Sequence, residues 1–175
     1  LYIDGARMGY GLTSPDTDVT LEDIANLSDM FYIGGTKCGA LLGEALVITN
    51  ESLKKDFRYI IKEHGALLAK GRLLGIQFDV LFEDNLYFTI CKQAVDYSIA
   101  IRKAFEAKGI QMWGDSSTNQ QFAILTDEQM ETLGKKYAYQ DWERYDDTHT
   151  VVRFCTSWGT KEENVQALIE DIAKL

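Results

Sequence analysis

Cysteine and histidine are scarce in this chain of 175 residues. The cysteines are odd in number and lack Cys-x-x-Cys spacing, at Cys38, Cys91 and Cys155. Neither a disulfide framework nor a zinc site is supported, and we expect reduced thiols. The two histidines, His64 and His149, have no partner at metal-ligand or catalytic-triad spacing. We interpret both as structural or surface residues and predict no metal.

The chain also has few positively charged residues and no long apolar run. Lysine and arginine number 18 against 27 acidic residues, which gives a net charge of −9. Proteins that bind nucleic acid need a basic surface, so this class is excluded. No apolar stretch approaches the ~20 residues needed to cross a bilayer, and no basic segment followed by an apolar core opens the chain. We therefore expect a cytoplasmic protein without a membrane partner.

Two short segments carry the chemistry of this chain. Each is an apolar run suited to a buried strand that ends in small residues and then a functional group, with Asp4 and Arg7 after the first and Lys37 after the second. A desolvated lysine loses proton affinity and forms Schiff bases with carbonyl compounds, including pyridoxal phosphate (PLP). A buried aspartate beside the ring nitrogen of PLP keeps it protonated, so that the cofactor can accept electrons. The spacing indicates half of a PLP site, with Lys37 and Asp4 as the catalytic candidates.

A purely structural interpretation of these residues stays open at this stage. Asp4 and Arg7 could cap a helix or pair with each other, and Lys37 could point to solvent from a glycine-rich turn. The Gly-Gly-Thr-Lys sequence is not the phosphate-binding loop of nucleotide-binding proteins, so nucleotide binding is rejected.

Four motifs, taken in order, resemble the low-specificity threonine aldolases, members of the β-eliminating lyase group of fold-type I PLP enzymes. The motifs are Asp-Gly-Ala-Arg at 4–7, Phe-Tyr-Ile-Gly-Gly-Thr-Lys-Cys-Gly-Ala-Leu-Leu-Gly-Glu at 31–44, Lys-Gly-Arg-Leu-Leu-Gly-Ile at 70–76 and Val-Val-Arg-Phe-Cys-Thr-Ser-Trp at 151–158. The resemblance runs from residue 1 to about residue 172. It implies the C-terminal half of the family sequence. The phosphate-binding loop and the histidine that stacks on the cofactor would precede this stretch.

The resemblance also assigns expected roles to individual residues. Arg153 interrupts an apolar strand, and in the resembled family the arginine at this place grips the substrate α-carboxylate. The alternative for Arg153 is a structural ion pair with an acidic residue. Arg7 is expected beside the cofactor and the substrate carboxylate, Thr36 beside the cofactor, and Arg72 near the cofactor phosphate. For Thr36 a plain turn hydroxyl, and for Arg72 a solvated helical arginine, are the competing interpretations.

The expected fold is α/β, the C-terminal part of a fold-type I PLP enzyme. We predict the end of a large, mostly parallel α/β domain over residues 1–60, connecting helices over 61–108 and a small α+β domain over 109–175. Residues 52–108 are rich in helix formers broken near Gly65 and Asp84, which predicts three helical stretches. Strands are predicted at 1–3, 31–33, 46–48, 110–113, 122–125, 137–142 and 151–155, and helices at 20–27, 127–135 and 161–174.

The function implied by the resemblance is PLP-dependent cleavage of the Cα–Cβ bond of a β-hydroxy-α-amino acid, such as threonine or allo-threonine, in a homodimer or homotetramer. β-Elimination and transamination would use the same Asp, Lys and Arg set and stay open as alternatives. A third alternative is a non-catalytic fragment that binds a partner chain or its own missing half, through an exposed sheet edge.

Overall fold

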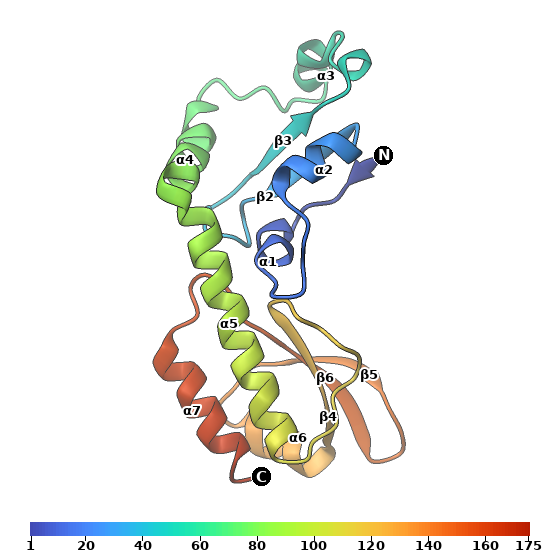
Figure 1. The fold of residues 1–175 in the computed structure, drawn as a ribbon, viewed down its shortest axis with the longest axis vertical. Helices are drawn as coiled ribbons and strands as arrows, with labels where there is room; N and C mark the ends of the chain where they lie inside the picture. Colours follow the sequence, from blue (N-terminus) through green and yellow to red (C-terminus); the bar gives the residue numbers. More distant parts are fainter. The chain divides into compact units, whose positions relative to one another are not determined.

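The computed structural model describes residues 1–175, which divide into two compact units (Figure 1). The first unit contains Leu1–Leu12 and Thr17–Ile90, and the second contains Thr13–Asp16 and Cys91–Leu175. None of the helices is both long and apolar enough to cross a membrane. The three-part division predicted from the sequence stays a prediction.

The first unit is built on a three-stranded sheet in the order β1-β2-β3. β1 (Tyr2–Ile3) runs parallel to β2 (Met30–Gly34), and β2 runs antiparallel to β3 (Glu44–Ile48). The helical elements of this unit are α1 (Met8–Leu12), α2 (Leu21–Leu27), η1 (Glu51–Leu53), α3 (Phe57–Glu63), α4 (Arg72–Phe82), η2 (Glu83–Asn85) and the start of α5 (Leu86–Ala107).

Local sequence signals explain where the helices of this unit begin and end. The Thr20 hydroxyl accepts a hydrogen bond from the Asp23 N–H at 3.1 Å, and the Asp23 carboxylate accepts one from the Thr20 N–H at 2.8 Å, so the capping box predicted for α2 is confirmed. The three helices predicted between residues 52 and 108 are confirmed as α3, α4 and α5. Gly65 and Asp84, where breaks were predicted, adopt positive φ angles of 71° and 50°.

Two expectations for this unit need correction. The strand at 46–48 was predicted as buried within a mostly parallel sheet, but β3 pairs antiparallel with β2, and Leu46 is 44% exposed. The reason is that residues 35–43 alone connect β2 to β3, too short a segment for the crossover that a parallel pair needs, so the chain turns back antiparallel. The five-residue helix α1 was not predicted, because Gly9 and Gly11 within it mask the helical signal.

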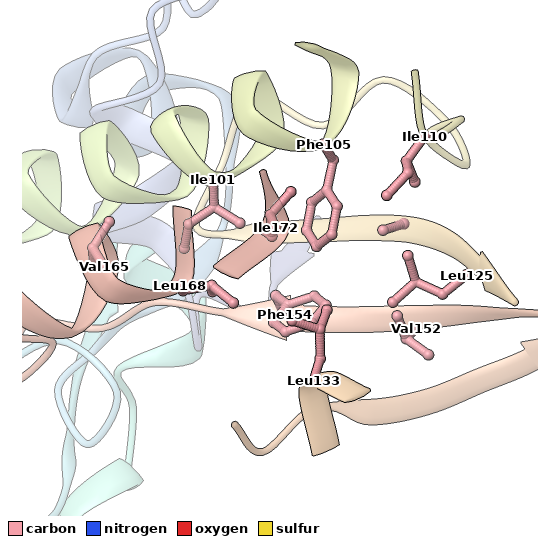
Figure 2. Packing of buried hydrophobic residues seen from close by; sticks show 11 residues of the cluster. Ile101, Phe105, Ile110, Leu125, Leu133, Val152, Phe154, Val165, Leu168 and Ile172 are labelled. Carbon is pink, nitrogen blue, oxygen red and sulfur yellow. The ribbon is translucent and has the colours of Figure 1, made fainter. Parts of the chain in front are cut away.

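The second unit packs three helices on one face of an antiparallel sheet in the order β4-β6-β5. Side chains alternate along a strand, and Val152 and Phe154 of the central strand point to the face that meets the helices. Figure 2 shows these residues among the side chains that fill the core. The elements are α5, β4 (Gln120–Thr126), α6 (Asp127–Gly134), β5 (Gln140–Arg144), β6 (His149–Cys155) and α7 (Glu162–Ile172).

Most predicted elements of the second unit are confirmed, with two exceptions. Residues 110–113 form only an isolated bridge, between Met112 and Ala123, because Gly109 and Gly114 turn the chain at positive φ on either side. The strand predicted at 137–142 begins only at Gln140, because the preceding tyrosines are held by contacts to α6 and α7.

The buried core of this unit allows a prediction about the free energy of unfolding. Phe105 is fully buried, and its ring centroid lies 5.4 Å from that of Phe154. We expect Phe105→Ala to lower the free energy of unfolding by about 3–5 kcal/mol, because it leaves a cavity among helices and sheet. Urea unfolding measures the change. The control Leu73→Ala removes a side chain that is 70% exposed and should change the value by less than about 0.5 kcal/mol; equal losses in both variants would contradict this description of the core.

Candidate functional site

Asp4 lies directly beyond the end of β1, where the neighbouring strand β2 supplies its main partner. The Tyr32 hydroxyl donates a hydrogen bond to Asp4 Oδ1, and the Ala6 N–H donates another at 3.1 Å. The parallel register pairs Ile3 with Phe31, so Tyr32 stands across from Asp4. The glycine after Asp4 is required, because a Cβ on Gly5 would lie 1.7 Å from the Tyr32 carbonyl oxygen.

These contacts favour the ionised form of Asp4. The hydrogen bond from Tyr32, then that from the Ala6 N–H, and the nearby positive charge of Lys37 hold the pKa of Asp4 below its ordinary value. The same bond to Asp4 raises the pKa of Tyr32 to about 12. Asp4 was expected to be buried, but in this chain it is exposed, because it lines an open pocket. Its ionisation therefore rests on hydrogen bonds and charge.

Tyr32 provides a test of this arrangement. We expect Tyr32→Phe to raise the pKa of Asp4 towards its ordinary value, because the largest contribution to the shift is removed. A pH titration of the Asp4 carboxyl carbon by NMR measures the change. Tyr59→Phe alters an exposed tyrosine and should leave the Asp4 titration unmoved. An unchanged Asp4 titration in Tyr32→Phe would contradict the assigned hydrogen bond.

Lys37 follows β2 in a turn whose backbone is firmly held. The N–H groups of Cys38 and Ala40 both donate to the Gly35 carbonyl oxygen at 2.9 Å, and the Tyr10 hydroxyl donates to the Lys37 carbonyl oxygen. The Lys37 side chain was expected to be desolvated, but it is exposed and forms no ion pair. The reason is that the turn carries its small, buried residues inward and leaves Thr36 and Lys37 on its outer side. The amine is thus accessible to a bound molecule.

Arg7 is half-buried and has no carboxylate partner. Its Nε atom is buried without a hydrogen-bond partner, and the predicted alternative of an ion pair with Asp4 is not present. Arg7 and Asp4 line the same open pocket, of about 430 Å³, together with apolar side chains of this unit. Unpaired buried donors are costly, so this pocket is suited to an anion or a carbonyl oxygen.

The two remaining candidates in this unit have weaker support. The Thr36 hydroxyl donates to the Gly43 carbonyl oxygen at 3.4 Å and is exposed, as a plain turn hydroxyl would be. Arg72, the first residue of α4, is exposed and makes no hydrogen bond or ion pair. Asp4, Arg7 and Lys37 are therefore the sequence-predicted residues with a defined local setting in the first unit.

Arg153 belongs to the second unit, on the face of the sheet opposite the core. Its Nη1 donates to Gln120 Oε1 at 2.9 Å, its Nη2 donates to Gln140 Oε1, and its Cζ lies 5.1 Å from the centroid of the Trp142 ring. No carboxylate pairs with it, so the predicted alternative of a structural ion pair is wrong. Sequence reasoning missed Tyr32, Gln120, Gln140 and Trp142. No local signal marked the face of Trp142, because the pairing of β5 is irregular between Asp141 and Glu143.

The sequence and the structure as a whole resemble those of threonine aldolases. No protein-family model matches the chain. The structure superposes on a threonine aldolase of Leishmania major with a TM-score of 0.96 and 42% sequence identity, over 99% of this chain and 51% of that one. The chain is a relative of the threonine aldolases. The resemblance predicted from the sequence is confirmed.

Further relatives support the same assignment. A low-specificity L-threonine aldolase of Pseudomonas sp. strain NCIMB 10558 is 29% identical over 180 residues, which cover 98% of this chain and 49% of that protein. The aldolase-related chain thus spans about half the length of the relatives it matches. A serine palmitoyltransferase of Sphingomonas wittichii, 13% identical over 99% of this chain and 46% of its own, has a TM-score of 0.68. That likeness concerns the fold alone, and the predicted α/β fold class is confirmed.

Proposed function

We propose that the protein containing this chain is a PLP-dependent lyase that cleaves the Cα–Cβ bond of β-hydroxy-α-amino acids. The observation that carries the proposal is the placement of an ionised Asp4 and an exposed, unpaired Lys37 just beyond the ends of neighbouring parallel strands. The similarity to threonine aldolases along 99% of the chain supports it. Threonine and allo-threonine are the proposed substrates, with glycine and acetaldehyde as products.

The residues present fit PLP. An amine that can form a covalent bond to an aldehyde, an ionised carboxylate that can accept the ring N–H, and a half-buried arginine with an unused Nε–H belong to one unit. Lys37 would hold the cofactor aldehyde, Asp4 the ring nitrogen and Arg7 a cofactor or substrate oxygen. Thr36 and Arg72 are proposed as further cofactor contacts. When bound, PLP supplies the sink for the electrons released as the Cα–Cβ bond breaks.

Arg153 would bind the α-carboxylate of the substrate. Its guanidinium has neutral partners only, so its positive charge is available to an incoming anion. A planar fork of N–H donors fixes the orientation of a carboxylate as well as its position. Orientation decides which bond at Cα is aligned for cleavage, so Arg153 would contribute to the choice of reaction.

The wider setting of the protein is also part of the proposal. We expect a homo-oligomer, because most soluble oligomers are symmetric assemblies of one chain. We further propose a cytoplasmic enzyme that acts on a small amino acid, in line with its aldolase relatives. The net charge of −9 argues against a nucleic-acid partner.

The identity of the products tests the reaction class. The PLP-loaded protein incubated with threonine should release acetaldehyde and glycine in equal amounts. β-Elimination of threonine would instead yield 2-oxobutanoate and ammonia, as serine would yield pyruvate and ammonia, and transamination would yield a keto acid and pyridoxamine phosphate. Either of those results in place of acetaldehyde would overturn the aldolase proposal, and the absence of any product would favour a non-catalytic fragment.

A further inference from the structure

We propose that Gln120, Gln140 and Trp142 are positioning residues that hold the Arg153 guanidinium through uncharged contacts and so keep its charge available for a substrate carboxylate. The inference rests on the proposed function, in which Arg153 binds the α-carboxylate. It adds that the contacts of Arg153 hold its side chain in place without neutralising its charge.

The pairing of three strands places these residues around Arg153. Arg153 lies on the central strand β6, directly across from Gln140 on β5. On the other side, Phe122 of β4 is its direct partner, and Gln120 stands two residues earlier on the same face. Trp142 lies where the register of β5 shifts between Asp141 and Glu143, and its ring contacts Arg153 and Phe122, which places it on the same face. Three adjacent strands therefore converge on one guanidinium.

The hydrogen bonds leave part of the guanidinium unused. An arginine has five N–H donors. Arg153 donates one hydrogen bond from Nη1 to Gln120 and one from Nη2 to Gln140. Its Nε–H is buried without a partner. The Trp142 ring, 5.1 Å from Cζ, adds a cation–π contact that limits rotation of the group. The group is held in position and still has donors to offer.

In its uncharged contacts Arg153 differs from the two arginines of this unit that form ion pairs. Arg102, also half-buried, pairs with Glu106 at 2.7 Å and Asp115 at 3.1 Å, and Arg144 pairs with Asp127 at 2.7 Å. The chain has 27 acidic residues, yet none is within ion-pair distance of Arg153. An internal carboxylate would compete with the substrate carboxylate for the same charge, whereas a glutamine oxygen occupies one donor and leaves the charge in place.

The substitution Gln140→Glu tests this idea, because it keeps an acceptor at the same place and adds a negative charge. In the natural full-length protein loaded with PLP, we expect KM for threonine to rise by about tenfold to a hundredfold, the range expected for losing one charge-assisted contact. The kcat should change by less than about threefold. The dissociation constant of glycine, measured by calorimetry without turnover, should rise in parallel with KM.

A merely structural role for Gln140 predicts a different result. Glutamate would preserve or strengthen the bond to Arg153, so KM and glycine affinity would stay unchanged; that outcome would overturn the inference. The matched control Gln166→Glu adds the same charge at an exposed position of α7 and should leave both values unchanged. Circular dichroism and thermal unfolding check that each variant is folded.

The second variant, Gln140→Met, keeps the length of the side chain and removes the acceptor without adding charge. It should raise KM less than Gln140→Glu does, and equal effects would overturn the claim that charge is what matters. If the unsubstituted protein cleaves threonine but the variants do not show the expected changes in KM and glycine affinity, the inference alone fails. If the unsubstituted protein neither cleaves threonine nor binds glycine, the proposed function fails and the inference falls with it.

Discussion

The substitution Lys37→Ala is expected to abolish threonine cleavage in the PLP-loaded protein, with a loss of at least about a thousandfold in kcat. The amine is the only group of the candidate site that can bond covalently to the cofactor aldehyde. Its backbone is fixed by the turn that begins at Gly35, so alanine should not disturb the fold.

The matched control for this variant is Lys103→Ala. Lys103 is an exposed lysine of α5 without an ion pair, so its removal should leave kcat within about twofold of the unsubstituted protein, as for surface changes away from a site. Acetaldehyde release gives the rates, and absorbance of the bound cofactor gives the loading. Full activity in Lys37→Ala would remove Lys37 from the mechanism.

The substitution Arg153→Ala should give the second largest effect. Losing a charged partner of a carboxylate costs about 2–5 kcal/mol, so we expect kcat/KM to fall by roughly 30-fold to several thousandfold. Arg153→Lys keeps the charge but loses the planar fork, and it should recover only part of the activity.

Arg58→Ala is the control for Arg153, because Arg58 is exposed on α3 and makes no ion pair. Its kcat/KM should match that of the unsubstituted protein. Full recovery of activity in Arg153→Lys would contradict a role for bidentate carboxylate binding, and an unchanged kcat/KM in Arg153→Ala would exclude Arg153 from the site.

The sequence allowed correct predictions where the residue type and the local structure gave the same signal. Asp4 and Lys37 could be recognised because each follows an apolar strand in which a charged group would be costly. The capping box at Thr20 and the apolar run of β6 are equally local signals, and both elements formed as predicted. The shared pocket of Asp4 and Arg7 was not predictable, because it depends on how α1 and α2 pack beside the strand end.

Contacts between distant segments account for what the sequence did not reveal. The Tyr32 hydroxyl reaches Asp4 because two strands 28 positions apart pair in one register, and a β1 of only two residues carries no pattern that specifies it. The absence of an acid beside Arg153 could not be read from a chain with 27 acidic residues. The exposure of Lys37 likewise depends on which segments pack over its turn.

The most direct test of the central claim is reductive labelling of the cofactor lysine. PLP is added to the protein, the adduct is reduced with borohydride, and the modified residue is identified by peptide mass spectrometry. We expect selective modification of Lys37 among the 12 lysines of the chain. Modification scattered over exposed lysines such as Lys55 and Lys103, or none at all, would contradict the claim that the ends of β1 and β2 form part of a PLP site.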